Sequence, residues 1–244
     1  MLSMTKYLGT VARMGGCPAY LGQFVDSFID MMAWNQQFFC QPNEFIYYPR
    51  FPHCSVHDVT RNMMVEEMRG DWLLQLDTDH QFEPDLLARL INVATQTEAD
   101  VVVGMYQFRQ HPHSPVLYRR LEDGFYPLVE WDRQATAMIV DSAGGGCLWA
   151  KRKVFDRIKT ELKEKPFARY EELSEDHSFF LRLRKLEIPV VCAPKVECHH
   201  LRIAPVTMAD YDRAWINQVR MVDSKVMRGS DNALPESVAA TTGV

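Results

Sequence analysis

The chain has 244 residues, of which 47% are hydrophobic, and this is enough for one large α/β domain with its own core. Acidic residues outnumber basic residues by 32 to 27, so the net charge of −5 gives no overall attraction to nucleic acid or to an anionic membrane. No stretch approaches the roughly 20 apolar residues of a membrane span.

The six cysteines form no Cys-x-x-Cys pair and no regular framework. The amino-terminal segment also lacks the pattern of a signal peptide. We therefore expect reduced thiols and a cytoplasmic location.

The first half of the chain alternates strand and helix patterns. Residues 8–14 predict a strand that ends at Gly15-Gly16, and residues 20–34 carry apolar residues at helical spacing. A strand, a glycine turn and a helix begin a nucleotide-binding α/β half, so Gly15 is a candidate donor-binding residue. Further strands are expected at 45–48, 72–76 and 100–104, and helices at 56–69, capped by Ser55 or Asp58, and at 84–95.

Asp77-Thr78-Asp79 follows the apolar run at 72–76 directly. The run predicts a buried strand that delivers two carboxylates to the carboxyl edge of a sheet, where open α/β sheets bind ligands. Carboxylates at this spacing suit a hard divalent cation that bridges the phosphates of a nucleotide. The alternative is that the motif only caps the next helix.

Residues 105–135 contain three prolines and many aromatic residues, which predicts substrate-contacting loops and a small antiparallel pair. Arg109 and His113 lie there, positioned to reach donor or acceptor. A strand is expected at 137–140, before Gly144-Gly145-Gly146. The backbone amides of these glycines can approach a ligand closely. The alternative is that the glycines form only a flexible turn.

Residues 151–165 form the most basic stretch, and Arg182, Arg184 and Lys185 add to it. If they share a face, an anionic polymer such as DNA would bind there. The alternative is two solvated helix faces that point elsewhere.

Ser174-Glu175-Asp176 opens a helical pattern, with Ser174 as the expected N-cap and Asp176 in the first turn. The helix dipole favours an ionised carboxylate there, which alone would account for Asp176. Residues 190–194 then predict a strand that leads to His199-His200. Taken alone, such a pair at a strand end is typical of exposed histidines without a ligand role.

This order, Asp-x-Asp, Gly-Gly-Gly, a helix opened by Glu-Asp and a strand ending in His, resembles the family 2-like glycosyltransferases of the GT-A fold over residues 55–203. The resemblance implies an α/β fold with a Rossmann-like, mixed and mostly parallel sheet flanked by helices. We expect one domain at 1–229, with a nucleotide-binding half at about 1–104 and an acceptor-side half at about 105–206. The apolar spacing of the residues that follow predicts a helix at about 207–228. Residues 230–244 are expected to form a disordered tail.

The resemblance also assigns roles. Asp79 would be the direct metal ligand, Asp77 would lie near the ribose or the metal, and His200 or His199 would complete the site. Asp176 would be the general base of an inverting reaction, supported by Glu175. The remaining assignments are donor binding by Arg61, Asn62 and Thr78, and sugar or acceptor binding by Gly144, Gly145 and Gly146.

The implied function is transfer of a sugar from a nucleoside-diphosphate sugar to an acceptor hydroxyl. Imidazole with two carboxylates favours Mn²⁺ over Mg²⁺. The opening at residues 13–18 departs from the family pattern, which leaves UDP and GDP donors both open, and the acceptor is a glycan, a protein or a 5-hydroxymethylated pyrimidine in DNA. The alternatives are a metal-dependent nucleotidyltransferase and an inactive nucleotide-sugar-binding module.

Overall fold

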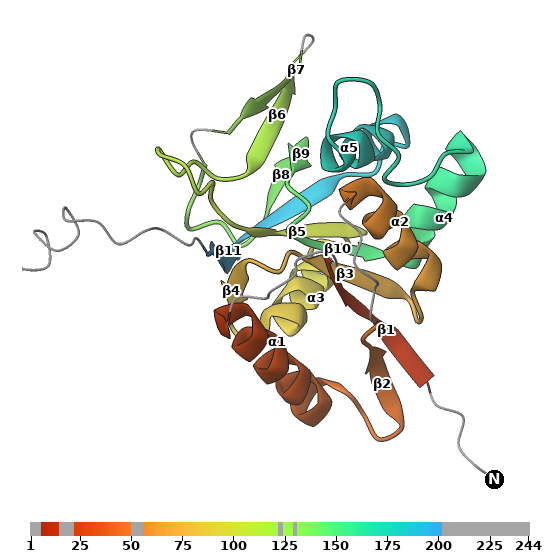
Figure 1. The fold of residues 1–244 in the computed structure, drawn as a ribbon, viewed down its shortest axis with the longest axis vertical. Helices are drawn as coiled ribbons and strands as arrows, with labels where there is room; N and C mark the ends of the chain where they lie inside the picture. The colour runs from red at the N-terminus through yellow and green to blue at the C-terminus, as the bar shows by residue number, and fades with distance from the viewer. Residues whose placement is uncertain (1–5, 15–21, 50–55, 122–123, 129–130, 202–244) are drawn as a thin grey trace, which may run out of the picture. The chain divides into compact units, whose positions relative to one another are not determined.

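The computed structural model describes residues 6–14, 22–49, 56–121, 124–128 and 131–201. A central sheet has the strand order β2-β1-β3-β10-β5-β11-β4, and β8 also pairs with β11 (Figure 1). Its strands are β1 (Lys6–Arg13), β2 (Glu44–Tyr47), β3 (Trp72–Leu76), β4 (His80–Phe82), β5 (Val101–Met105), β8 (Met138–Val140), β10 (Cys147–Lys151) and β11 (Val190–His200).

The sheet is mixed and mostly parallel, which confirms the expected fold class. β1 pairs in parallel with β2 and β3, and β5 pairs in parallel with β11. β10 lies between β3 and β5 and is antiparallel to both, while β4 and β8 are antiparallel to β11. A separate small sheet joins β6 (Leu117–Leu121), β7 (Gly124–Pro127) and β9 (Ser142–Ala143), which confirms the antiparallel pair expected within residues 105–135.

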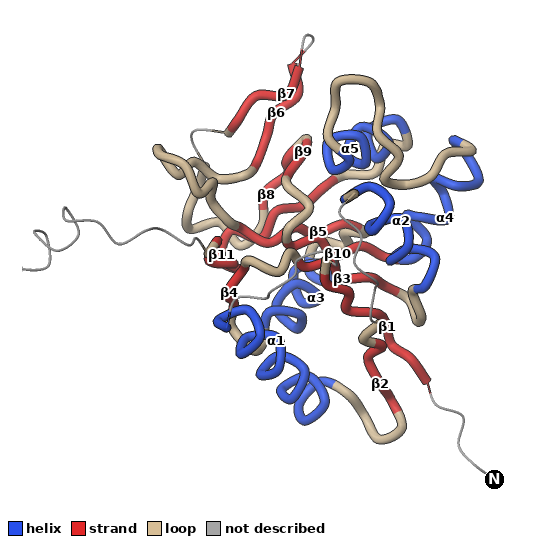
Figure 2. Tube along the Cα trace, in the orientation of Figure 1, coloured by secondary structure: helices blue, strands red, loops and turns tan. Residues whose placement is uncertain are grey.

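Helices cover both faces of the central sheet (Figure 2). One hydrophobic core contains side chains of α2, α4 and α5, and the other contains side chains of α1 and α3. These helices are α1 (Gly22–Trp34), α2 (His57–Glu67), α3 (Leu86–Gln96), α4 (Arg152–Arg157) and α5 (Glu175–Lys185), and π-helical turns at Asn35–Phe39 and Ile158–Leu162 extend α1 and α4.

Neighbouring residues of the inner strands serve opposite cores. Leu73 packs with α2, α4 and α5, whereas Leu74 packs with α1 and α3, and Val101 and Val102 divide in the same way. A strand buried on both faces needs apolar residues at nearly every position, which explains the apolar runs. Each fully buried side chain of this kind contributes about 1.5–3 kcal/mol.

The predicted helix caps are confirmed for α5 but not for α2. Ser174 caps α5 as predicted, because its Oγ accepts a hydrogen bond from the His177 amide. The prediction that Asp58 caps α2 is wrong, because the cap residue is Val56 and makes no side-chain hydrogen bond. Gly70 lies between α2 and β3 with φ of +78°, and a Cβ there would collide with the backbone of β1, so this bend needs glycine.

Some predicted features lie outside the described residues, namely Gly15, Ser55, the helix at 207–228 and the tail at 230–244. The cysteines that the structure describes, Cys40, Cys147, Cys192 and Cys198, carry free thiols. Among the described residues, no helix combines the length and apolarity needed to cross a membrane.

Candidate active site

The predicted site residues gather at one edge of the central sheet. Asp77 and Asp79 follow β3, and His200 ends β11. Backbone hydrogen bonds join these segments, from Asp77 N to Gly146 O (2.9 Å) and from Leu201 N to Asp79 O (2.7 Å). Open α/β sheets bind their ligands at such an edge.

A cluster of three side chains there has the chemistry of a cation site. One ligand atom from each of Asp79, His80 and His200 lies within 4.8 Å of the others. Asp79 Oδ1 and His80 Nε2 are buried, and no described residue forms a hydrogen bond with either atom. Since buried polar atoms nearly always have a partner, these two fit an electron-pair acceptor, and a divalent cation is such a group.

The two histidines present the same nitrogen to the cluster. Nδ1 of His80 faces the carbonyl oxygen of Gly146 (3.2 Å), and Nδ1 of His200 faces that of Gln107 (2.8 Å). A carbonyl only accepts, so the proton belongs on each Nδ1 and a lone pair remains on each Nε2, the usual arrangement of metal-binding histidine. Burial also lowers the pKa of His80 to about 4, which keeps its imidazole neutral at physiological pH.

Arg109 lies against this cluster. Its guanidinium contacts the Asp79 carboxylate and donates from Nε to His200 Nε2 (2.8 Å). In this structure Arg109 therefore uses the Nε2 lone pair of His200 and one oxygen of Asp79, so a bound cation would take the place of the guanidinium at these two atoms. Contact of Arg109 with donor or acceptor stays a prediction. His113 is exposed, and its Nδ1 faces the carbonyl oxygen of Phe108 (2.9 Å) in the same loop.

Of the two histidines at the end of β11, the structure brings His200 to Asp79. Its Nε2 lies 3.5 Å from Asp79 Oδ2. The His199 side chain is 66% exposed and lies 3.9 Å from Glu197, because alternate residues of a strand face opposite sides. Asp77 does not belong to the cluster, although it begins the same turn.

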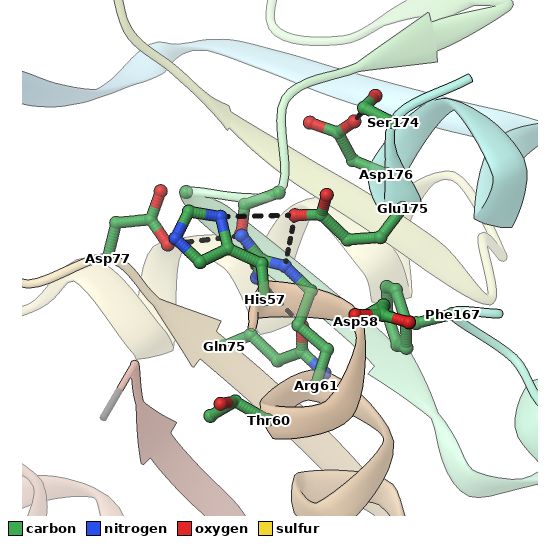
Figure 3. A network of polar contacts seen from close by, with 12 residues as sticks. His57, Asp58, Thr60, Arg61, Gln75, Asp77, Phe167, Ser174, Glu175 and Asp176 are labelled. Atoms are coloured by element: carbon green, nitrogen blue, oxygen red, sulfur yellow. Dashed lines mark hydrogen bonds and ion pairs between the residues drawn. The ribbon is translucent and has the colours of Figure 1, made fainter. Parts of the chain in front are cut away.

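Asp77 instead faces a buried arginine (Figure 3). Arg61 of α2 is 2% exposed and donates from Nη2 to Asp77 Oδ1 (3.1 Å) and from Nε to Glu175 Oε1 (3.3 Å). His57, in the first turn of α2, places Nδ1 3.6 Å from the same Glu175 oxygen. The turn after β3 and the start of α5 are thereby joined through one guanidinium.

Glu175 and Asp176 are neighbours with different surroundings. Burial alone would raise the pKa of Glu175, but the contact with His57 and the charge of Arg61 lower this pKa to about 2. The contact with Glu175 also raises the pKa of His57. Asp176 Oδ1 accepts hydrogen bonds from the Ser174 hydroxyl and from the His177 amide (2.8 Å).

The three glycines at 144–146 are packed against the site. A Cβ on any of them would lie closer than 3.0 Å to another side chain, namely to Tyr106 at Gly144, to Arg61 at Gly145 and to His80 at Gly146. The amide of Gly146 also donates to the Tyr106 hydroxyl (3.1 Å). The turn needs glycine for this close packing, and its contact with sugar or acceptor stays a prediction.

Asn62 and Thr78 occupy the places that the sequence indicates. Thr78 lies in the turn between β3 and β4. The Asn62 side chain accepts from the amide of Phe167 (3.0 Å) and donates to the carbonyl oxygen of Asp58 (2.8 Å). Their contact with the nucleotide stays a prediction.

Three site residues escaped the sequence interpretation: His80, Tyr106 and His57. His80 directly follows Asp79, so its position in the motif was visible, but β4 is only three residues long and was not expected. Tyr106 follows β5 with its ring 4.6 Å from His80 and 5.7 Å from His200, and burial raises its pKa. A single aromatic residue after a strand carries no signal for this placement.

Comparison with known proteins gives a family match. The model of the family described as "Glycosyl transferase family 2" matches residues 39–159, which include the Asp-x-Asp turn, the cationic Arg61 and the glycine turn. The chain is a family 2-like glycosyltransferase. The expected GT-A type of sheet is confirmed by the mixed, mostly parallel strand order. No curated protein matches the glycosyltransferase sequence.

Several solved structures are similar to the glycosyltransferase. A197 from STIV is 17% identical with a TM-score of 0.49, and the match covers 83% of this chain and 98% of A197. S. aureus TarS 1-349 is 11% identical with a TM-score of 0.44 and 80% of this chain covered. TarS 1-349 in complex with UDP-GlcNAc is 9% identical with a TM-score of 0.49, and the match covers 84% of this chain. The glycosyltransferase spans 60% of the length of either TarS structure.

Proposed function

We propose that this glycosyltransferase moves a sugar from a nucleoside-diphosphate sugar to an acceptor hydroxyl, with inversion at the anomeric carbon. The observation that carries the proposal is the convergence of Asp79, His80 and His200 at the sheet edge that α5 also reaches. Asp79, His80 and His200 would hold a divalent cation. When bound, the cation would stabilise the negative charge that the departing nucleoside diphosphate gains.

The donor set favours a transition metal. Two neutral imidazoles and one carboxylate suit Mn²⁺ better than Mg²⁺, which prefers oxygen ligands alone. The second carboxylate of the motif, Asp77, would face the ribose or the metal with the oxygen that Arg61 leaves free.

Asp176 would be the general base that takes the proton from the acceptor hydroxyl as this oxygen attacks the anomeric carbon. Glu175 is less suited, because a carboxylate with a pKa of about 2 is a weak base and its Oε1 is held by Arg61. Glu175 would instead fix the start of α5, and with it the position of Asp176.

For the acceptor, a hydroxyl on a glycan or a protein is favoured over a 5-hydroxymethylated pyrimidine in DNA. The two basic stretches predicted to attract DNA contain cations that pair with carboxylates. Lys151 and Lys153 both contact Asp100, at 2.8 and 2.6 Å. Arg182 is buried against Glu164 at 2.7 Å.

The proposal is tested by incubating the protein with UDP- and GDP-linked sugars and Mn²⁺, and measuring the nucleoside diphosphate that is released. We expect one donor to be hydrolysed slowly without acceptor and faster with it, and chelation to stop both reactions. A nucleotidyltransferase would release no nucleoside diphosphate from these donors, and would release pyrophosphate only when a nucleoside triphosphate and a sugar phosphate are supplied in a parallel mixture. An inactive binding module predicts no turnover in either mixture. Duplex DNA carrying 5-hydroxymethylated pyrimidines, included beside glycans and peptides, separates the acceptor classes.

Asp79→Asn should abolish Mn²⁺-dependent binding of UDP or GDP in calorimetry and leave the fold intact, because it removes the anionic ligand of the cluster. Asp85→Asn is the matched control, since Asp85 lies in the cap of α3 with its side chain 43% exposed. Wild-type nucleotide affinity in Asp79→Asn would reject the cation site.

A further inference from the structure

Arg61 is buried, and every nitrogen of its guanidinium forms a hydrogen bond within the chain. Besides its bonds to Asp77 and Glu175, Nη1 donates to the Gln75 side-chain oxygen (3.0 Å) and to the Gly145 carbonyl (2.9 Å). Figure 3 shows the guanidinium between the turn after β3 and the start of α5. These partners come from segments far apart in the sequence.

The burial of this charge is offset mainly by the two carboxylates. An unpaired cation inside a protein is very costly, and a cation flanked by two anions is stabilised by both. The nearby carboxylates raise the pKa of Arg61 although burial lowers it, so the guanidinium stays charged. A planar guanidinium also fixes the directions of both carboxylates, which the ammonium of lysine cannot do.

We propose that Arg61 is a positioning residue that sets the start of α5 against the turn after β3. Its partner Asp77 lies in the same motif as Asp79, and its partner Glu175 is followed directly by Asp176. The guanidinium thus fixes the distance between the cation ligand and the base. This inference rests on the proposed function, and it assigns Arg61 a role other than binding the diphosphate.

The test compares Arg61→Lys with Arg182→Lys. Arg182 is also a buried arginine, it lies on α5, and it pairs with Glu164 and the Ser178 carbonyl outside the site. We expect both variants to lose thermal stability. Only Arg61→Lys should also lower kcat, by about 10²-fold, the loss typical of a displacement of about 1 Å at a reacting centre.

The split between kcat and KM separates positioning from diphosphate binding. A positioning residue predicts that KM for the donor and the affinity for UDP or GDP with Mn²⁺ change little. A large rise in KM with kcat preserved would overturn the proposal, as would a kcat loss of the same size in Arg182→Lys. Gly145→Ala is a second variant, and it keeps the arginine and its charge. The added Cβ would lie 2.6 Å from the guanidinium carbon and displace it, so this variant should also lower kcat.

A second measurement does not depend on turnover. If Arg61 links the two carboxylates, the losses of melting temperature in Asp77→Asn and Glu175→Gln should not add up in the double variant. Additive losses would overturn the link. An inactive wild-type protein with non-additive losses would instead reject the proposed function and leave the link standing.

Discussion

At the scale of single residues, the site shows how neighbouring carboxylates acquire different tasks. Glu175 pairs with the guanidinium of Arg61 and is a weak base, whereas Asp176 accepts a hydrogen bond from Ser174, the cap of its own helix. The chain separates them by one position in the first turn of α5, where backbone direction sends adjacent side chains to different neighbours. The role of each therefore follows from its partners.

Asp176→Asn tests the base. Because general base catalysis contributes about 10²–10⁴-fold, we expect kcat to fall on that order while the donor still binds. Glu171→Gln is the matched control, since Glu171 is exposed in the loop before α5 and should keep wild-type kcat. NMR of the product should show an inverted anomeric centre. A retained configuration would rule out the mechanism, and an active Asp176→Asn would rule out the residue.

Acid unfolding tests the pairing of Glu175. Its pKa falls from 4.5 to about 2 on folding, so between these values the folded chain binds fewer protons than the unfolded chain. The pairing stabilises the fold fully above about pH 4.5, and this stabilisation is lost as the pH falls towards 2. Glu175→Gln should therefore be less stable than wild type at pH 7, and the gap should narrow below pH 4.5 in urea denaturation. A gap independent of pH would contradict this pairing.

At the scale of elements, the pairing of β4 with β11 builds the cation cluster. His80 and His200 are direct partners in the antiparallel register, and their ring centroids lie 4.9 Å apart. His199 is paired with Gln81 and faces the other side. A slip of one residue would exchange the two histidines.

His200→Ala and His199→Ala form a matched pair for this register. We expect His200→Ala to weaken Mn²⁺ binding by about 10-fold or more, since it removes a ligand, and His199→Ala to leave it unchanged. Electron paramagnetic resonance of free Mn²⁺ measures both without any donor sugar. Equal effects of the two substitutions would contradict the register.

The sequence predicted the elements better than the contacts between them. The apolar run at 72–76 and the cap at Ser174 each carry a local signal, and both were confirmed. His80 was missed because a strand of three residues has no periodicity to detect. The pairing of Arg61 with Glu175 joins residues 114 positions apart, and an arginine on a helix carries no mark of the burial that tertiary packing gives it.

At the scale of the described molecule, two cores share one sheet. Side chains of α2 and α5 belong to one core, and side chains of α1, α3 and β4 belong to the other. The inner strands can serve both cores because they are apolar at nearly every position. In β3 the exception is Gln75, and its side chain accepts from Arg61 beside the site. The candidate cation ligands lie at strand ends, and Arg61 and Glu175 come from α2 and α5.

The place of β11 in the sheet has a consequence for the growing polypeptide. β11 lies between β5 and β4, although it is the last of the described strands in the sequence. Until it leaves the ribosome, β5 has one unpaired edge, and β4 has no strand partner among the described strands. A nascent chain that stops before residue 190 would thus hold an open sheet without His200. Pairing of β11 with β5 and β4, and arrival of His200 beside Asp79 and His80, therefore depend on the same segment of the nascent chain.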